Sequence, residues 1–580
     1  MRKLNKIIIA ILILLFSFSI VGCIGKEGAA NFDSFINGLP KEFIENNSLD
    51  LEFLFRDPSQ YGFDEEILKL PVNDKKLHEE GIKSTNEVID KLKKFDYKKL
   101  SKEQQLTYDV LLDSLNRNLL LKDYYYINNN ELGSSLGFQA QLPILLQEFK
   151  FDKKIDIDSY LNILETSEDT FKKYANNEKE RQSQRVGMSQ TIINKVIEQC
   201  DNFTKDDSTF LIDAFNSKIN NVEFLKDEEK KYYKEKNLEL TKVNFKNAYK
   251  TLANELKAID AKEDNVGLWG KSDGKSYYEA LMQYNTGIDD SIKEVEKYLN
   301  NKVREYGKEI NKLITENPEL MNRFIEANIQ YTDLNNEIEV LNYLGNKINE
   351  DFPALESLNF NVKEVDQSMK DNFSPAAYIS SRIDTPISEN ETIFINGKFS
   401  QDIFTMLAHE GYPGHMYQNV YFKSLNKPTI RYILNYSGYS EGWANYIEGI
   451  AIKYATGDKD LLKLYYLNTK IIEIKIALLD IGVNYSGWDK EKFIENIQSF
   501  FGELEDNAIE EQYNQIIENP TNSLKYYLCS EKFKDLHDDA KKKLGDKFID
   551  KEFHRVILQT GPSSFEILKN RVDEYIDETI

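Results

Sequence analysis

Apolar residues recur at intervals of three and four positions along most of the chain, with lysines and glutamates between them. This spacing is typical of amphipathic helices that bury one face. Before residue 370 it predicts helices within residues 82–100, 101–121, 161–200, 227–256 and 276–314. After residue 400 it predicts helices near 440–456, 459–481, 489–516, 523–544, 549–556 and 563–578. The sequence therefore predicts a mainly α fold.

One short segment departs from the helical pattern. Thr392-Ile393-Phe394-Ile395-Asn396 is β-branched and aromatic, and Asn390 and Gly397 bound it. It follows a break in the helical pattern over residues 372–390, and these features predict a strand. Ser400 is expected to cap the helix that comes next. The strand would thus lie directly before that helix.

The first 23 residues have the pattern of a bacterial export signal. Three basic side chains fall within residues 2–6, and an apolar run follows over residues 7–20. Because this run is shorter than the roughly 20 residues that a membrane-spanning helix needs, we interpret residues 1–22 as a signal peptide. Ile20-Val21-Gly22-Cys23 resembles the lipobox of bacterial lipoproteins, and the alternative is an ordinary signal peptide with a chance cysteine. A lipid on Cys23 would anchor the protein to the extracytoplasmic face of the cell membrane.

The charge of the chain is strongly acidic. Residues 1–22 carry three positive charges and no negative ones, so their removal takes the formal net charge from −23 to −26. This balance argues against a nucleic-acid partner, because phosphate binding needs clustered Lys and Arg. Beyond Cys23 only Cys200 and Cys529 occur, both in helix-like apolar patterns. Two buried thiols are therefore favoured over a disulfide.

The chain shows no long linker rich in Pro, Ser or Gly, and its 12 prolines and 27 glycines are few for 580 residues. We expect a lipid-anchored tether over residues 23–33. A helical N-terminal region over residues 34–370 is expected to cover the site, and residues 371–580 to form a metal-binding catalytic region. The two regions are expected to pack as one continuous body.

Two of the five histidines lie close together, in Ala408-His409-Glu410-Gly411-Tyr412-Pro413-Gly414-His415. A His-Glu pair followed by a second His is the kernel of zinc peptidases, in which neutral imidazoles bind the metal. Zinc lowers the pKa of a bound water and polarises the scissile carbonyl. The carboxylate of Glu410 would collect the proton and pass it to the leaving amine.

The spacing of the two histidines differs from the usual four residues. Six residues correspond to about 600° of helical rotation, which leaves the rings about 120° apart and shifted by about 9 Å. On a straight helix both rings could not reach one metal at about 2.1 Å. Pro413 and Gly414 disturb a helix interior, so we predict a two-residue bulge that returns His415 to the face of His409. The alternative is a pair that flanks a helix end.

A third ligand is predicted 26 residues after His415. In Ser440-Glu441-Gly442-Trp443-Ala444-Asn445-Tyr446-Ile447-Glu448 the two glutamates are nearly two helical turns apart, so their carboxylates point the same way. Two His and one Glu leave a fourth position for water, as catalytic zinc requires. We assign Glu441 as the ligand and Glu448 as the partner of an imidazole N–H. The alternative is a helix with two exposed glutamates.

These segments resemble those of a known bacterial family. His409 through Gln418 and Glu441-Gly442-Trp443-Ala444 match the signatures His-Glu-x-x-Pro-Gly-His-x-x-Gln and Glu-Gly-Trp-Ala of the family called domain of unknown function 885. Many members are candidate lipoproteins, and the family is usually grouped with zincin-type metallopeptidases. The resemblance extends over most of the mature chain and implies one zinc ion. It also implies a helical body with a small β-sheet beside the metal helix, in which residues 392–396 would be the substrate-side strand.

Further residues are interpreted with the resemblance in view. Tyr526 matches a family tyrosine and would donate a hydrogen bond to the oxyanion; the alternative is a packed helix tyrosine. His554 would stabilise the same charge or hold substrate, and the alternative is a surface histidine. His78, although followed by Glu79, is expected on a helix surface, and His537 is expected to be solvated.

Together these features predict an extracytoplasmic zinc-dependent peptidase of the oligopeptidase or carboxypeptidase kind, with short peptides as substrates and Glu410 as general base. Two other readings stay open. One is a lipoprotein that binds peptide or metal without turnover. The other is a zinc hydrolase of a non-peptide amide or ester.

Overall fold

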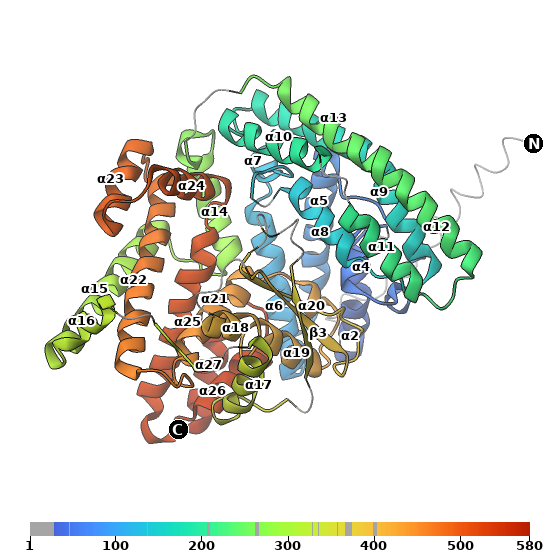
Figure 1. Ribbon diagram of the computed structural model, residues 1–580. Helices are drawn as coiled ribbons and strands as arrows, with labels where there is room; N and C mark the ends of the chain where they lie inside the picture. Colours follow the sequence, from blue (N-terminus) through green and yellow to red (C-terminus); the bar gives the residue numbers. More distant parts are fainter. Residues whose placement is uncertain are drawn as a thin grey trace, which may run out of the picture.

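The computed structural model describes residues 28–580, apart from 46, 136, 206–208, 262–265, 327–328, 335, 356–357, 366–369, 371–373 and 398–402. The predicted signal peptide, Cys23 and the Ser400 cap lie outside the described residues. Helices dominate the described chain (Figure 1), so the prediction of a mainly α fold is confirmed. No helix within the described ranges is both long and apolar enough to cross a membrane.

Two hydrophobic cores organise the molecule. The smaller one, here called the N-terminal core, draws its buried side chains from residues 44–261 and includes the fully buried Tyr160, Phe171 and Tyr249. Helices α9 and α10 both pack against α13. In Figure 1 the elements of this part form the top and the right side of the molecule. They are α4 (Asp50–Leu54), α8 (Phe138–Glu148), α9 (Lys154–Ser183), α10 (Gln190–Lys205), α11 (Thr209–Asn221), α12 (Asp227–Leu240), η3 (Thr241–Phe245) and α13 (Lys246–Lys257).

The larger core joins the first helices of the chain to its C-terminal half. Its buried residues come from 32–127, 186 and 268–576, so the two cores do not divide at the expected boundary near residue 370. Helix α21 packs along α25, and α15 packs along α22. The main helices of this core are α2 (Ala29–Gly38), α5 (Lys75–Leu92), α6 (Lys102–Leu120), α14 (Gly274–Thr286), α15 (Ile292–Glu316), α17 (Glu337–Lys347), α18 (Ile403–Glu410), α19 (His415–Ser424), α21 (Ser437–Ala451), α22 (Lys459–Asn484), α25 (Asn522–Leu544), α26 (Asp550–Thr560) and α27 (Phe565–Thr579).

Shorter or peripheral helices connect these elements. They are α3 (Pro40–Phe43), η1 (Pro58–Tyr61), η2 (Tyr97–Lys99), α7 (Tyr125–Asn128), η4 (Leu268–Gly270), α16 (Glu319–Glu326), η5 (Ile348–Glu350), α20 (Ile430–Ile433), α23 (Lys490–Phe501), α24 (Asp506–Glu518) and η6 (Gly545–Lys547). Helices α23 and α24 pack on α22 around a small separate cluster of apolar side chains.

The small sheet has three strands in the order β1 (Asn359–Glu364), β3 (Asn390–Ile395) and β2 (Ala376–Ile379). Strand β1 is parallel to β3 and β2 is antiparallel to it. The predicted strand is β3, but its assignment to the substrate side is wrong, because β3 is paired on both edges. The edge strand that contacts α18 is β2.

Several predicted helices are broken where the backbone takes a positive φ. The stretch 161–200 divides into α9 and α10 near Arg185, at φ 60. The stretch 276–314 divides after Gly287, at φ 68, and 489–516 divides after Gly502, at φ 79. Residues in this left-handed region end a helix. Apolar periodicity continues across such breaks, so it could not locate them.

The described N-terminal residues are more ordered than a tether would be. Helix α2 begins at Ala29, inside the predicted tether of residues 23–33. Phe32 is 1% exposed, and its ring lies 5.2 Å from that of Phe95. Burial of this side chain fixes the chain to the larger core from α2 onward. Cys200 and Cys529 are both buried and free, as predicted.

Candidate metal centre

The two histidines of the motif lie on two different helices. His409 is the penultimate residue of α18, and His415 is the first residue of α19. Between them, Gly411 N–H donates to the Leu407 carbonyl and Gly414 N–H to the Ala408 carbonyl, both at 2.9 Å. The predicted bulge within one helix is therefore wrong. A four-residue turn ends one helix and starts the next, because a proline in the turn cannot continue the hydrogen-bond pattern of α18.

Gly414 allows the tight return of the chain after this turn. A Cβ atom built on Gly414 would lie 1.8 Å from the carbonyl oxygen of His409 and 2.4 Å from that of Ala408. Any side chain there would force the two helices apart. The indole N–H of Trp443 donates to the Pro413 carbonyl at 3.0 Å, which fastens the turn to α21.

Glu441, on α21, completes a convergent group. Its Oε2 lies 3.3 Å from Nε2 of His415 and 4.0 Å from Nε2 of His409. The two imidazole rings are 4.8 Å apart and 84° from parallel. One ligand atom from each residue lies within 4.8 Å of the others, and the structure shows no other such trio of His, Cys, Asp or Glu among its described residues.

The donor set fits a zinc ion. Tetrahedral ligation at about 2.1 Å places ligand atoms about 3.4 Å apart, so the observed separations close by small side-chain rotations. Two imidazoles and one carboxylate belong to the class of ligands that catalytic zinc uses, with one position open. His409, His415 and Glu441 are the residues that would hold the ion.

Glu448 lies behind His409, on the same helix as Glu441. Its Oε1 is 2.7 Å from Nδ1 of His409. Since an ionised carboxylate only accepts, the Nδ1–H of His409 is the donor, so in the neutral ring Nε2 carries the lone pair on the side of Glu441. The hydrogen bond thus fixes the tautomer that a metal ligand needs.

A buried polar network supports Glu448 in turn. The Asn445 amide lies 3.5 Å from Glu448 and 3.3 Å from Glu473. The Lys470 ammonium donates to Asn445 and to Glu473, both at 2.7 Å. One cation therefore faces two buried carboxylates and an amide, which restrains all of these side chains.

The electrostatics of the site favour a cation. Burial lowers the pKa of His409, but the hydrogen bond to Glu448 and the charges of Glu448, Glu410 and Glu441 raise it to about 9. Burial raises the pKa of Glu441, yet the hydrogen bond from His415 and the neighbouring cations lower it overall. Three carboxylates around two imidazoles attract positive charge, from a proton or from a metal ion.

Glu410 is directed toward the sheet. Its Oε2 accepts a hydrogen bond of 2.7 Å from the backbone N–H of Tyr378, on edge strand β2. The Tyr378 hydroxyl is held by Glu391 at 2.7 Å. The predicted base thus lies between the metal ligands and the edge strand β2. The sequence did not predict this strand.

Tyr526, on α25, lies beside the ligands. Its ring stacks on that of His409 at 6.4 Å. Its hydroxyl hydrogen-bonds to Glu441, and burial together with this carboxylate raises the pKa of the phenol. The structure therefore brings Tyr526 to the predicted site as a neutral donor.

The structure does not bring His554 to this group. The side chain is 1% exposed, its Nδ1 lies 2.7 Å from the Asp351 carbonyl and its Nε2 lies 3.1 Å from the Tyr446 hydroxyl. Burial lowers the pKa of His554 to about 4. The prediction of a catalytic His554 is wrong, because both ring nitrogens are engaged inside the core.

The expectation for His537 is also wrong. It is 9% exposed rather than solvated, and Nε2 lies 2.7 Å from Asp550. Its neighbour Asp538 lies 3.2 Å from Nδ1, so the charged run around His537 supplies a partner and did not indicate exposure. His78 lies at the surface of α5, where Nε2 is 2.7 Å from the Lys122 carbonyl.

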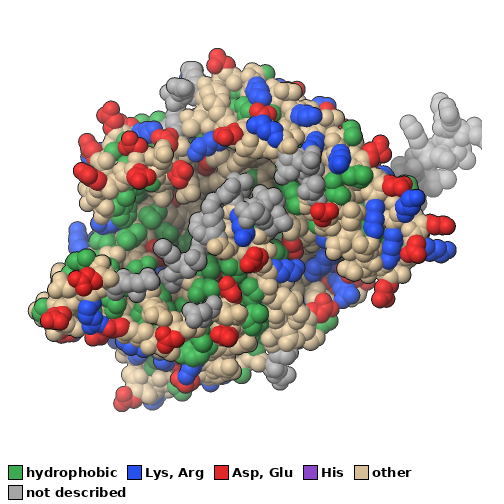
Figure 2. Space-filling model, viewed as in Figure 1, with side chains coloured by type: hydrophobic (Ala, Val, Ile, Leu, Met, Phe, Trp, Pro, Cys, Tyr) green, Lys and Arg blue, Asp and Glu red, His purple; other side chains and the backbone are tan. Residues whose placement is uncertain are grey.

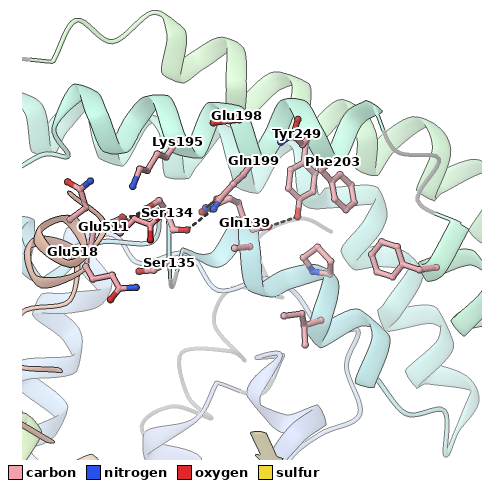
Figure 3. A pocket seen from close by; sticks show the side chains of 17 residues that line it. Ser134, Ser135, Gln139, Lys195, Glu198, Gln199, Phe203, Tyr249, Glu511 and Glu518 are labelled. Atoms are coloured by element: carbon pink, nitrogen blue, oxygen red, sulfur yellow. Dashed lines mark hydrogen bonds between the residues drawn. The ribbon is translucent and has the colours of Figure 1, made fainter. Parts of the chain in front are cut away.

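A cleft leads away from Tyr526. One cavity of about 660 Å³ is lined by this tyrosine and mainly by hydroxyl and amide side chains. A second cavity of about 670 Å³ adjoins it, since they share five lining residues, Ser134, Ser135, Ala140, Gln199 and Gln515. Figure 3 shows the polar side chains that face this second cavity, with Lys195 among Glu198, Glu511 and Glu518. Figure 2 shows a hollow near the middle of the face that is turned toward the viewer.

The walls of the cleft come from distant parts of the chain. Ser134, Gln139 and Gln199 belong to the first half of the sequence, whereas Gln515 and Tyr526 belong to the last part. Sequence reasoning expected the N-terminal region to cover the site but named none of these residues, since isolated Ser and Gln carry no motif.

Comparison with other proteins gives a family and two similar structures. A candidate lipoprotein of Colwellia psychrerythraea superposes with a TM-score of 0.79 at 17% identity, over 95% of this chain and 99% of that one. A candidate lipoprotein of unknown function from Shewanella oneidensis superposes with a TM-score of 0.63 at 13% identity, over 93% and 98%. A search of curated proteins found no match. At these identities the two structures share the fold.

The family model described as bacterial protein of unknown function matches residues 59–572, which include the histidine motif, Glu441 and Tyr526. The match covers most of the chain, in agreement with the resemblance read from the two motifs. The chain belongs to this family, DUF885.

Proposed function

We propose that this protein is a zinc-dependent peptidase that hydrolyses short peptides outside the cytoplasm. The single observation that supports this most strongly is the convergence of His409, His415 and Glu441, with Glu410 next to the first ligand. A passive metal site needs no carboxylate directly beside a ligand, whereas hydrolysis needs a base there.

A zinc ion held by these residues would supply Lewis-acid activation of a water molecule and of the scissile carbonyl. Glu410 would take the proton from that water and deliver it to the leaving amine. Its Oε2 is held by Tyr378, so the carboxylate is oriented before substrate arrives. Tyr526, which now binds Glu441, would turn its hydroxyl to the carbonyl oxygen as negative charge develops there.

The cleft supports peptides as the substrate class. Its walls carry serine hydroxyls and the amides of Asn and Gln, which can donate to and accept from a peptide main chain. Because it lies between helices of both halves of the chain, a short or extended peptide fits it better than a folded protein.

The lipobox-like segment and the similar structures support a location for the proposed enzyme. The segment Ile20-Val21-Gly22-Cys23 has the form of a lipobox, and both similar structures are described as candidate lipoproteins. We infer that a lipid on Cys23 anchors the enzyme at the extracytoplasmic face of the membrane.

The test combines metal analysis of the soluble mature protein with digestion of a peptide library read by mass spectrometry. The expected result is about one zinc per chain and cleavage that a chelator abolishes and added zinc restores. Bound zinc without cleavage of any peptide would contradict the peptidase. Peptide binding without cleavage would then indicate a binding protein, and cleavage of small amides or esters would indicate a different hydrolase.

A further inference from the structure

Arg431 is a buried cation that the proposed reaction does not use. It lies on α20, in the segment that joins the helix of His415 to the helix of Glu441. The side chain is 0% exposed. Its Nη2 donates to the Thr560 carbonyl at 2.6 Å, and its Cζ lies 5.7 Å from the ring centre of Phe422. Nε and Nη1 have no hydrogen-bond partner within the described part of the chain.

Other buried arginines of this protein are paired with acids. Arg117 is bonded to Asp113 at 2.8 Å and Arg181 to Glu178 at 3.0 Å. Among the described residues, Arg431 forms no such ion pair. Burial lowers its pKa to about 10, so it stays charged at neutral pH. The charge of Glu103 also acts on Arg431, but that carboxylate is exposed and paired with Lys427. A buried charge without a close partner is strongly destabilising, so this guanidinium needs a counter-charge.

A second buried donor, Gln418, lies on the preceding helix, α19. Gln418 is 3% exposed, and the Tyr439 hydroxyl is at most the only hydrogen-bond partner of its Nε2 among the described residues. It is four positions before Phe422 on α19, so the two side chains are neighbours, and Arg431 stacks on Phe422. Burial raises the pKa of Tyr439, whereas the Gln418 amide and the charge of Arg431 both act to lower it.

We propose that Arg431 and Gln418 form a buried binding site for a monovalent anion, with chloride as its ligand. The donors available to it are N–H groups, which bind anions, and one negative charge balances one guanidinium. Both side chains are closed to solvent, so a monatomic ion fits better than a carboxylate or phosphate group. The inference does not depend on the proposed peptidase activity.

The site would stabilise the arrangement of the metal ligands. Gln418 is one turn after His415 on α19, Tyr439 precedes Glu441 by two residues on α21, and Arg431 lies between the two helices in sequence. An anion bound by α19 and α20 beside Tyr439 therefore fastens the two segments that carry His415 and Glu441.

Thermal unfolding of the mature protein in sodium chloride and in sodium gluconate, at equal ionic strength, tests the proposal. At a chloride concentration about 100 times the dissociation constant, linkage predicts a Tm about 2 °C higher in chloride. Arg431→Met removes the charge and should abolish the difference. Arg117→Met removes a buried arginine that already has carboxylate partners, so the chloride effect should remain.

Two further measurements keep the proposal falsifiable if Arg431→Met does not fold. Gln418→Leu retains the charge, so it should shift the chloride dependence to higher concentration without abolishing it. Crystals soaked in bromide should show an anomalous peak between Arg431 and Gln418. Equal Tm values in chloride and gluconate for the unaltered protein, or ordered water alone at this position, would overturn the anion site.

Discussion

Nδ1 of His409 lies 2.7 Å from Oε1 of Glu448, which is seven positions after Glu441 on the same helix. One helix therefore supplies both a candidate ligand and the acceptor that orients another ligand. Since the seven-residue spacing places both carboxylates on one face, α21 presents them together to the end of α18. This relationship leads to the first prediction.

Glu448→Gln is expected to weaken zinc binding about 10- to 100-fold, because the amide accepts the imidazole N–H less strongly and lacks the charge. Competition with a chromophoric chelator measures the affinity. Glu503→Gln, an exposed carboxylate in the loop after α23, is the control and should bind zinc as the unaltered protein does. Equal affinity in both variants would show that Glu448 does not support the metal.

Glu410→Gln is expected to keep zinc and to lose about 10²–10⁴-fold or more in hydrolysis, since the amide cannot accept the proton of water. Peptide cleavage and metal content are measured on the same sample. Glu79→Gln is a matched control, because it alters the other His-Glu pair of the chain, which lies at the surface of α5. Cleavage by Glu410→Gln at the normal rate would reject Glu410 as the base.

Gly414→Ala is expected to destabilise the protein by at least about 1–3 kcal/mol, as overpacking does. The reason is the 1.8 Å approach of its Cβ to the His409 carbonyl oxygen. Chemical denaturation measures the change, and the same variant should lose zinc because the two histidines are displaced. Gly307→Ala, inside α15 with nothing within 4 Å of the new Cβ, should instead be neutral or add up to about 1 kcal/mol.

The free energy of unfolding is expected to decrease as the pH is lowered from about 6.5 to 4, because of His554. Burial lowers its pKa to about 4 in the folded state, from 6.5. In this window the unfolded chain binds a proton that the folded one excludes, so protonation favours unfolding. The full difference corresponds to about 3 kcal/mol.

Denaturant unfolding at a series of pH values checks this prediction. His554→Gln should show a shallower pH dependence over the same window, although the variant is less stable overall. His78→Gln, at the surface, should keep the slope of the unaltered protein. A slope that His554→Gln leaves unchanged would mean that other groups produce it.

Much of the fold could be predicted because amphipathic helices carry their own pattern. Ser101 and Gln104 form a capping box at the start of α6, where the predicted helix begins. Between α9 and α10, by contrast, the apolar spacing continues through a turn. Periodicity reports which face is buried, and it does not report where the backbone changes direction.

The candidate ligands could be predicted because they lie in two short segments of unusual composition. Their convergence needed only a change of chain direction near Pro413. The predicted bulge within one helix was wrong, because a turn between two helices makes this change. His554 could not be interpreted in this way. Its neighbour Phe553 and the helix around it look the same whether the imidazole faces substrate or the core, and only its bonds to Asp351 and Tyr446 decide.

By itself, the sequence determined the helical character, the two histidines and two glutamates of the centre, and the membership of the family, since each depends on residues close together in the chain. The tertiary structure alone decided that β2 is the strand beside Glu410, that Tyr526 stacks on His409, and that Ser134 and Gln199 face the cleft. These contacts join residues tens to hundreds of positions apart. They arise from the packing of whole helices on two cores, which no local pattern encodes.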